Sequence, residues 1–280
     1  MRKYLALFAV IAAVLALAAC GDDGNDSAAS TAAGTTAAAD LGLKTPGTLT
    51  VASDIPYAPF EFTDPGSKEP KGFDIDLVNA IAKTQGIANV QFVDQPFDTI
   101  ILSIKQGTYD MSASSWTITP EREKEVAFGD KYFSANQAIL AQKDDTSITD
   151  EASLAGKTIA VQRGTVGGEV AATIPDAKVQ RFQNTDDAFN AVAQGRADAA
   201  ITDYPVVAYA AAQKPTLRVT AEIPGDLGLG LMFPKSNTAL RDAFNAGLAQ
   251  IKADGTYDKI YATWFGEAPS TTSTTATTTQ

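Results

Sequence analysis

Short apolar strands alternate with amphipathic helices along most of this 280-residue chain, and this alternation limits the possible folds more than any other feature. Residues Leu49–Ser53 and Lys157–Val161 have the short apolar pattern of buried strands. Phe73–Gln85 carries apolar residues at helical spacing and is followed by Gly86, a residue that commonly ends a helix. Such an alternation is typical of α/β proteins and predicts that fold class here.

A short pattern occurs twice and indicates two units of similar build. Residues 106–110 (QGTYD) end a predicted helix over 97–106 and open a strand. Residues 194–198 (QGRAD) end a second predicted helix over 186–194 and again open a strand. In each case glycine supplies the left-handed conformation that stops the helix. We therefore expect two α/β lobes.

Two extended runs and two late helices complete the predicted core. Residues 137–141 and 229–233 are candidates for strands that cross between the lobes. Helices over 238–252 and 257–264 would then return to the first lobe. The predicted boundaries are a first lobe over 44–136 and 230–267 and a second lobe, with its flanking hinge strands, over 137–229.

The two ends of the chain carry segments that we do not expect in the core. Residues 1–19 combine a basic start with a short apolar run, which is typical of a signal peptide. Their end resembles the bacterial lipobox, which implies cleavage before Cys20 and lipid on its thiol; a plain secretory signal is the alternative. Residues 20–43 are predicted to be a lipid-anchored flexible tether, and 268–280 a disordered Thr-rich tail.

Composition argues against several classes of function. The formal net charge is −11, whereas nucleic-acid binding needs basic patches. The chain has no histidine, and Cys20 is its one cysteine. Zinc sites and Ser-His or Cys-His catalysis therefore lack their usual residues. We expect no metal, no cofactor and no nucleic-acid partner.

Polar side chains follow the predicted strands, where ligands bind in open α/β sheets. Asp54 follows the strand at 49–53, and Asp203 follows the strand at 199–202. The segment SSWTITPER (114–122) follows a strand that begins near Met111, and the glycine-rich turn RGTVGG (163–168) follows the strand at 157–161. Carboxylates suit an ammonium group, and arginine with hydroxyl and N–H groups suits a carboxylate. The collection therefore favours a zwitterionic ligand.

Arg122 is the candidate for the anionic end of such a ligand. Thr119 and Pro120 are typical first residues of a helix, which places Arg122 in its first turn. A cation there opposes the helix dipole unless an anion lies between. Taken alone, the segment favours a surface arginine paired with a neighbouring glutamate. Asp54 and Asp203 taken alone could equally cap turns, so it is the combination that favours a site.

Five segments resemble, in order and spacing, the solute-binding proteins of family 3, the amino-acid-binding proteins of bacterial ABC importers. They are SDIPYAPFEF (53–62), GFDIDLVNAIAK (72–83), SSWTITPERE (114–123), QGRADAAITDYP (194–205) and KADGTYDKIYATWFG (252–266). The resemblance covers about Gly47 to Gly266. It implies an α/β, two-lobed periplasmic-binding-protein fold of type II, in which two crossover strands join lobes that close on one amino acid.

The resemblance also implies roles for individual residues. Asp54 and Asp203 would hold the α-ammonium group, and Arg122 would hold the α-carboxylate. Around the carboxylate, further contacts would come from Ser115, Thr117, Thr165 and Val166. Beside the ligand side chain would lie Tyr57 and Phe97. Two more residues, Gln162 and Thr202, sit where members of the family vary with the ligand. Val166 replaces a Thr or Gly that is common in the family, although its backbone N–H remains. The sequence leaves open whether Trp116 and Arg163 face the ligand.

The implied function is a monomeric, lipid-anchored receptor on the extracytoplasmic face of the cell membrane. It would capture a free amino acid and pass it to the permease of an ABC importer, without enzymatic activity. Arg122, Asp54 and Asp203 together carry a net negative charge, which favours a neutral polar ligand first and a basic one second. Two alternatives remain: a dehydratase on the same scaffold, with Asp54, Asp203 or Glu169 as general acid, and a ligand sensor not coupled to transport.

Overall fold

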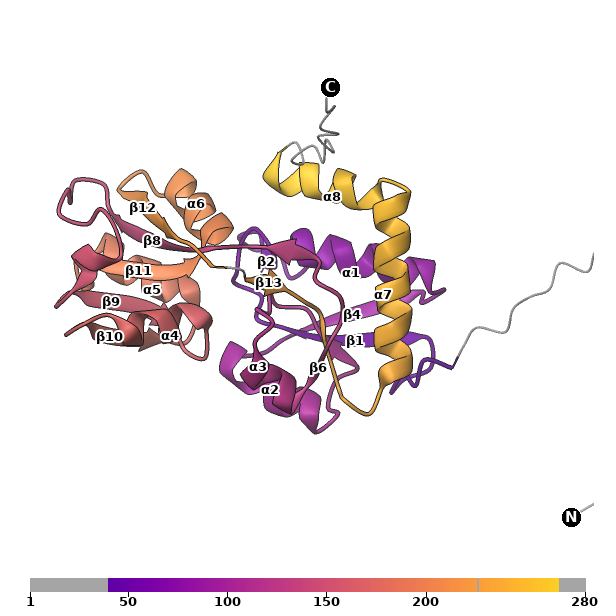
Figure 1. Cartoon of the computed structure of the whole chain (residues 1–280). Coiled ribbons are helices and arrows are strands. Elements are labelled where there is room, and N and C mark those ends of the chain that lie inside the picture. Colours follow the sequence, from indigo (N-terminus) through magenta and orange to yellow (C-terminus); the bar gives the residue numbers. More distant parts are fainter. Residues whose placement is uncertain (1–39, 226, 267–280) are drawn as a thin grey trace, which may run out of the picture. The chain divides into compact units, whose positions relative to one another are not determined.

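The computed structural model describes residues 40–225 and 227–266. The predicted signal peptide (1–19), the lipidation site at Cys20 and the Thr-rich tail (268–280) lie outside the described residues. Two five-stranded sheets with helices packed on them make up the described chain, which is therefore the two-lobed α/β structure expected from the sequence (Figure 1).

The first lobe is built on a sheet with the strand order β4-β1-β5-β14-β6. Its strands are β1 (Thr48–Ser53), β4 (Asn89–Asp94), β5 (Met111–Ser112), β6 (Ala127–Phe128) and β14 (Met232–Phe233). β1 runs parallel to β4 and β5, whereas β14 is antiparallel to β5 and β6. The helices of this lobe are α1 (Phe73–Thr84), α2 (Phe97–Lys105), α3 (Pro120–Glu125), α7 (Thr238–Ala253) and α8 (Thr256–Phe265), and a small hairpin pairs β2 (Phe62–Thr63) with β3 (Pro70–Lys71).

The second lobe repeats this plan with the strand order β10-β9-β11-β8-β12. Its strands are β8 (Gln137–Gln142), β9 (Thr158–Gln162), β10 (Lys178–Phe182), β11 (Ala199–Asp203) and β12 (Leu217–Ile223). β9 is parallel to β10 and β11, and β8 is antiparallel to β11 and β12. The helices are α4 (Val166–Thr173), α5 (Thr185–Ala193) and α6 (Tyr204–Gln213), with a 3-10 turn, η1, at Ala152–Leu154.

The chain connects the two lobes through a pair of short strands. β7 (Phe133–Ser134) pairs antiparallel with β13 (Gly228–Leu229). The expected crossing strand at 137–141 is instead β8, which lies inside the second sheet between β11 and β12. This interior position explains its unbroken apolar run, because a strand flanked on both edges and covered on both faces has no solvent side. The run at 229–233 is likewise divided between β13 and β14.

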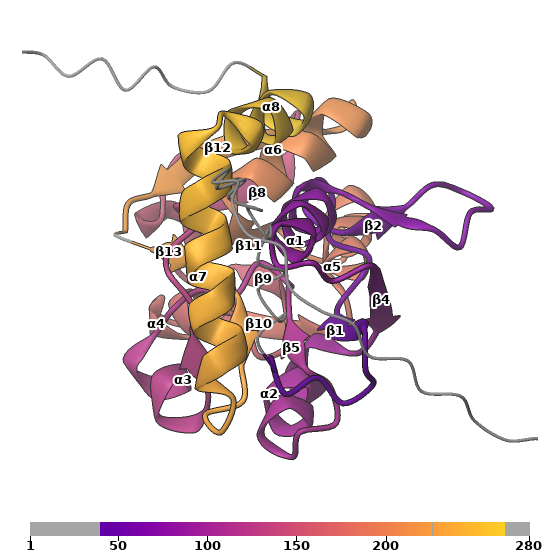
Figure 2. The ribbon, with the colours of Figure 1, turned by 90° about the vertical axis from the view of Figure 1, so that its right-hand side faces the viewer.

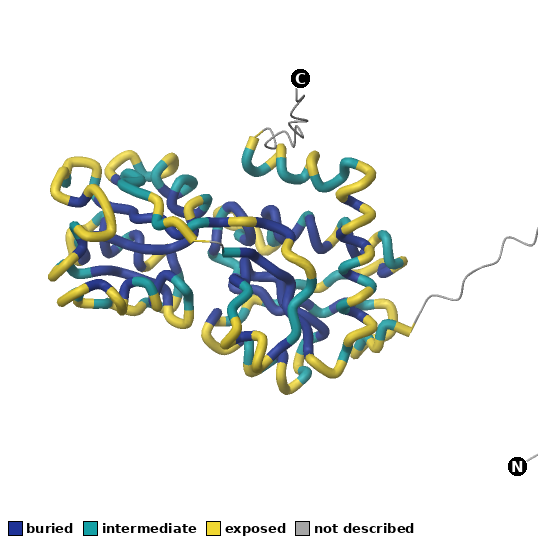
Figure 3. The backbone as a smooth tube through the Cα atoms, viewed as in Figure 1, coloured by how far each residue is buried: buried dark blue, intermediate teal, exposed yellow. Residues whose placement is uncertain are grey.

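The helices covering the first sheet come from both ends of the lobe's sequence. Helix α7 contacts α1 and α8, so segments that are far apart in the chain pack side by side (Figure 2). Asn237 caps α7, because its side-chain oxygen accepts a hydrogen bond from the N–H of Leu240 at 3.1 Å. The inner strands β1, β8 and β11 are mostly buried, whereas the edge strands β4 and β10 are half-buried or exposed (Figure 3).

The tether predicted over 20–43 is too long at its C-terminal end. Leu41 and Leu43 pack against the first lobe as partly buried residues, and the amide of Asn237 donates to the carbonyl of Leu41 at 3.0 Å. These two leucines supply the apolar surface that residues 21–40 lack, which is why the fold includes them. Among the helices within residues 40–225 and 227–266, none has the length and apolar character needed to cross a membrane.

Candidate functional site

A cavity of about 320 Å³, including space open to solvent, lies where strand ends of the two lobes face each other. It is lined from the first lobe by Tyr57, Phe97, Ser114, Ser115, Thr117 and Arg122, and from the second by Gln137, Gln162, Thr165, Val166, Gly167, Thr202 and Asp203. Nine of the ten residues predicted from the sequence are among them. The tenth, Asp54, does not line the cavity.

The local structure around Arg122 follows from the residues before it. Pro120 is the first residue of α3, and Thr119 caps the helix by accepting a hydrogen bond from the N–H of Arg122 at 3.2 Å. The side chain of Arg122 is only 7% exposed and turns toward the cavity. The alternative of a surface arginine paired with a glutamate is therefore wrong.

The guanidinium of Arg122 is held by carbonyl groups and aromatic rings. It donates to the carbonyl oxygens of Thr117 at 2.8 Å and of Gly164, in the second lobe, at 2.9 Å. It also lies 5.0 Å from the ring centre of Trp116 and 5.7 Å from that of Phe97. Burial lowers the pKa of Arg122 somewhat, but no carboxylate is bound to this buried cation within the described chain. The guanidinium of Arg122 is thus held in place with donors that can bind an anion.

Phe97 and Trp116 form one stacked unit. Their ring centres are 4.1 Å apart and the rings are inclined by 18°. Phe97 lines the cavity, whereas Trp116 lies behind it, 1% exposed, with its indole N–H donating to Ser112 at 2.8 Å. Trp116 therefore supports Phe97 and Arg122 rather than facing the cavity.

Asp203 is the buried anion on the other side of the cavity. Its Oδ2 accepts a hydrogen bond from Tyr57 of the first lobe at 2.6 Å, and its Oδ1 accepts from Gln137 at 2.5 Å. Burial raises the pKa of Asp203 to about 6, although both hydrogen bonds act to lower it. The Oε1 of Gln137 is buried without a hydrogen-bond partner among the described residues. This pair of acceptors suits a cationic group.

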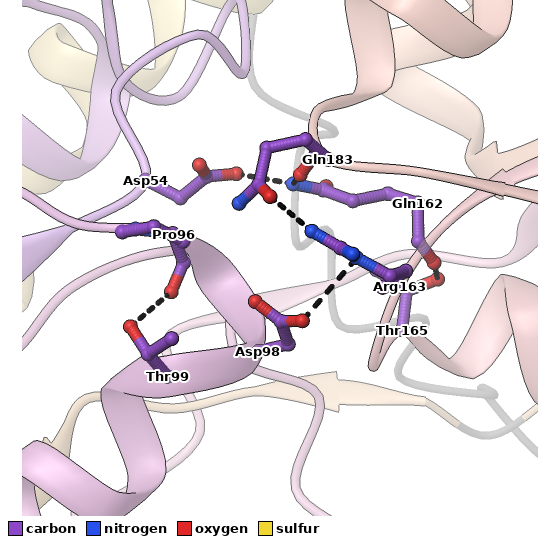
Figure 4. Close-up of polar contacts among 8 residues, drawn as sticks. All are labelled: Asp54, Pro96, Asp98, Thr99, Gln162, Arg163, Thr165 and Gln183. Atoms are coloured by element: carbon purple, nitrogen blue, oxygen red, sulfur yellow. Dashed lines mark hydrogen bonds and ion pairs between the residues drawn. The ribbon is translucent and has the colours of Figure 1, made fainter.

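Asp54 does not line the cavity, but it is bonded to Gln162, which does. Figure 4 shows this contact between the two side chains. The Nε2 of Gln162 donates to Asp54 at 2.6 Å and to the carbonyl of Gln183 at 3.0 Å, and its Oε1 accepts from Thr185 at 2.9 Å. Burial raises the pKa of Asp54 to about 7. The carboxyl group of Asp54 therefore acts on the cavity through Gln162.

The glycine-rich segment 163–168 leads into helix α4, which begins at Val166. Gly164 adopts a φ of +77°, and Thr165 caps α4 by accepting from the N–H of Gly168 at 3.2 Å. A Cβ on Gly167 would lie 2.5 Å from the carbonyl oxygen of Ile201, so only glycine fits this approach of α4 to β11. Because Thr165, Val166 and Gly167 line the cavity, the N-terminus of α4 opens onto it, which favours an anion.

Arg163 points away from the cavity. It forms an ion pair with Asp98 of α2, with 3.3 Å between Nε and Oδ2, and a hydrogen bond with Gln183 (Figure 4). Arg163 is exposed and is not among the lining residues. Its ion pair therefore links the two lobes outside the cavity. Arg163 adds no positive charge to the cavity itself.

Four lining residues were not among the predicted site residues: Ser114, Gln137, Gly167 and Thr202, although Thr202 was noted as a variable position. Ser114 and Thr202 adjoin predicted residues and could have been included on that ground. Gln137 has no local signal, because it reaches the site only through the antiparallel register that pairs it with Asp203.

A model of the bacterial extracellular solute-binding proteins, family 3, matches residues 49–267. The chain is 39% identical over 217 residues to an arginine-binding periplasmic protein of Mannheimia haemolytica, covering 75% of this chain and 88% of that protein. It is 32% identical over 273 residues to the ABC transporter glutamine-binding protein of Bacillus subtilis, covering 96% and 99%. Among solved structures, an ancestral amino acid-binding protein described as a precursor of cyclohexadienyl dehydratase matches with a TM-score of 0.72 and 42% identity, over 78% of this chain and 95% of that one.

The hydrogen bond from Tyr57 predicts how Asp203 titrates. Tyr57→Phe removes a donor that favours the ionised carboxylate, so we expect the pKa of Asp203 to rise above about 6. Since this pKa is already above its value in unfolded chains, the free energy of unfolding falls as pH rises toward it, and the variant should extend that fall to higher pH. Carboxyl NMR titration measures the pKa.

Tyr109→Phe is the control, because Tyr109 has no hydrogen bond to Asp203 among the described contacts. An Asp203 pKa that is the same in Tyr57→Phe and in the wild type would contradict the arrangement described here.

Proposed function

The chain belongs to family 3 of the bacterial extracellular solute-binding proteins, and we propose on that premise that it is a receptor for a free amino acid that serves an ABC importer. The observation that carries this proposal is that buried Arg122, on the first lobe, lines one cavity together with buried Asp203 and the N-terminus of α4, on the second. A free amino acid has the same two charges on one carbon atom.

The α-carboxylate of the ligand would bind to Arg122. Two of its donors are already used by the carbonyls of Thr117 and Gly164, which fix the plane of the guanidinium. The remaining donors can grip a carboxylate, and the N–H groups at Val166 and Gly167 can assist from the start of α4. The hydroxyls of Ser115 and Thr117 lie on the same wall.

The α-ammonium group would bind to Asp203. The free Oε1 of Gln137 offers a second acceptor beside it. The sequence-based expectation that Asp54 shares this role is less well supported, because Gln162 separates Asp54 from the cavity. We assign Asp54 instead to the far end of the ligand, where a long side chain that displaces the amide of Gln162 would reach it.

For the ligand side chain we propose a polar group, neutral first and basic second. Arg163 is engaged with Asp98 outside the cavity, so it offers no cation for an acidic side chain. Tyr57 and Phe97 offer ring surfaces, and Gln162 offers an amide. Relatives named as binding glutamine, which is neutral, and arginine, which is basic, support these two classes of side chain.

Ligand binding would couple the two lobes. Tyr57 with Asp203, Arg122 with Gly164 and Asp54 with Gln162 already form hydrogen bonds from one lobe to the other. A ligand that contacts both walls favours the state in which the lobes meet, in proportion to its differential affinity for it. The strand pair β7 and β13 is the proposed hinge.

We propose that the protein is monomeric and acts on the extracytoplasmic face of the membrane, held there by lipid on Cys20. The lipobox-like end of the leader and the low-complexity residues 21–40 support an anchored receptor on a tether. Delivery to a permease is supported by the relatives' description as ABC transporter proteins.

An enzymatic role is the second candidate, and the likeness to a dehydratase precursor is the observation that favours it. Such a role needs a general acid in the cavity. Glu169 is exposed on α4 and does not line the cavity, and Asp54 is covered by Gln162, which leaves Asp203. Recovery of unchanged ligand after prolonged incubation would decide for binding, and conversion would decide for catalysis.

A screen for ligand-induced stabilisation tests the receptor directly. Thermal unfolding of residues 40–268 would be measured with each of the twenty amino acids in turn. A ligand at about a thousand times its Kd stabilises the native state by ~4 kcal/mol, which raises the midpoint by several degrees. We expect one or a few polar amino acids to respond, and a response from none would contradict the proposal.

Arg122→Ala should abolish tight binding of the amino acid found in that screen. We expect a loss of ~3–5 kcal/mol in binding free energy, because the ligand carboxylate would stay buried without its partner. Arg163→Ala is the matched control, since it removes an arginine from an exposed ion pair worth at most ~1 kcal/mol. Calorimetry that finds similar losses in both variants would refute the assignment of Arg122.

Asp54→Asn separates a neutral from a basic ligand. For a neutral side chain we expect the Kd to change by less than about threefold, because Asp54 would not contact the ligand. Asp203→Asn is the comparison. It should weaken the binding of every amino acid that the wild type binds, since all of them share the ammonium group. If Asp54→Asn instead greatly lowers the affinity for arginine or lysine and for no other amino acid, the ligand is basic.

A further inference from the structure

Two acidic side chains lie directly behind the cavity wall and are not used by the proposed ligand contacts. Glu61, which precedes β2, and Asp74, the second residue of α1, are both 0% exposed. Both carboxyl groups accept hydrogen bonds from Ser115, Asp74 from its N–H and Glu61 from its hydroxyl, so they lie close together. A buried pair of this kind needs a physical explanation, because ionised carboxyl groups are costly to remove from water.

The hydrogen bonds of this pair lead to the cavity wall. Oδ2 of Asp74 accepts from the N–H of Ser115 at 2.9 Å and from the hydroxyl of Tyr132 at 2.8 Å. Glu61 accepts from the hydroxyls of Ser114 at 3.2 Å and of Ser115 at 3.4 Å. Oδ1 of Asp74 is buried without a donor among the described residues. A proton carried by Glu61 would supply that donor.

The surroundings of the pair do not neutralise two negative charges. The titratable groups that act on it are Asp54, Asp203, Tyr57, Tyr132 and Tyr257, all acids or phenols. Burial, followed by the charge of its partner, raises the pKa of Glu61 well above its ordinary range, and burial also raises the pKa of Asp74. Proton retention by the pair therefore agrees with both its geometry and its electrostatics.

The pair also holds a backbone conformation that is uncommon for a side-chain-bearing residue. Ser115 has a φ of +48°, in the left-handed region. Its N–H is bound by Asp74 and its hydroxyl by Glu61, so the two acids fix this residue from behind. Ser114 is fixed as well and accepts a hydrogen bond from the N–H of Asp54 at 3.0 Å. Both serines line the cavity, which makes the shape of this wall depend on the pair.

We propose that Glu61 and Asp74 are positioning residues that share a single proton, as a carboxylic acid hydrogen-bonded to a carboxylate, and so hold Ser114 and Ser115 in the conformation that binds the ligand. The positioning role rests on the proposed function. Loss of the shared proton leaves two facing carboxylates that repel each other, releases the wall and adds negative charge behind the ligand carboxylate. Because the protonated form is the competent one, affinity falls as pH rises past the loss of that proton.

Infrared spectroscopy of the unliganded protein tests the proton without any ligand. At about pH 8.5, where Asp54 (pKa about 7) and Asp203 (pKa about 6) are mostly ionised, we expect the C=O stretch of a buried, protonated carboxyl group to remain. Glu61→Gln and Asp74→Asn should each remove this band, because an amide then supplies the donor and the remaining acid stays ionised. Asp110→Asn is the matched control: Asp110 is 2% exposed in the same lobe, but it accepts three hydrogen bonds, from the N–H groups of Lys44 and Thr50 and from the Thr50 hydroxyl. It should leave the band unchanged.

Calorimetry against pH then tests the positioning role. We expect Glu61→Gln to bind within about threefold of the wild type near pH 7, because its amide donates to Asp74 as the shared proton does. Above the loss of the proton, wild-type affinity should fall by up to about tenfold per pH unit beyond the fall seen in Glu61→Gln. The titration of the ligand amine is common to both proteins and cancels, and Asp110→Asn should follow the wild-type profile.

The outcomes are separable. Absence of a protonated carboxyl band, or a band that survives both substitutions, overturns the shared proton. A band that behaves as expected, together with identical affinity profiles in wild type and Glu61→Gln, overturns the positioning role. Failure of every amino acid to bind overturns the proposed function and with it the positioning role, while the infrared result still decides the proton.

Discussion

The burial of one cation and one anion on opposite walls of a single cavity is the constraint on which the rest of this structure depends. Neither charge is satisfied within its own lobe alone. Arg122 belongs to the first lobe and donates to the carbonyl of Gly164 in the second, whereas Asp203 belongs to the second and accepts from Tyr57 in the first. Since an unsatisfied buried charge is costly, each lobe completes the hydrogen bonding of the other. The same groups that a ligand would use therefore also hold the lobes together.

Sheet topology is what brings these groups to one place. The parallel strands β1, β9 and β11 all end toward the cavity, and the segments after them carry the charged and polar side chains. The antiparallel pairing of β8 with β11 adds a residue from a strand's beginning, because it sets Gln137 opposite Asp203. The residues that line the cavity thus come both from the segments after strands and from the start of β8, the strand that follows β7.

Local pattern predicted much of the fold but less of the site. Helices α1, α2 and α5 begin and end within about two residues of their predicted bounds, because apolar spacing and a following glycine are local signals. Helix α4 was missed since two glycines open it, and Gly167 is explained only by its approach to β11. The burial of Arg122 likewise depends on the stacked rings of Trp116 and Phe97, and the withdrawal of Asp54 depends on Gln162; neither contact has a local signal.

Buried carboxyl groups outnumber buried cations around the cavity, and this excess determines which of them keep a proton. Asp54, Asp203, Glu61 and Asp74 are all buried there, whereas Arg122 is the one buried cation within residues 40–225 and 227–266. Four ionised carboxylates would be prohibitive in such a place, and burial raises the pKa of each one. Retained protons therefore offset part of this negative charge, above all the proton proposed between Glu61 and Asp74. The ammonium group of a bound amino acid would supply positive charge beside Asp203, whereas Glu61 and Asp74 do not line the cavity and would keep their proton as part of the wall.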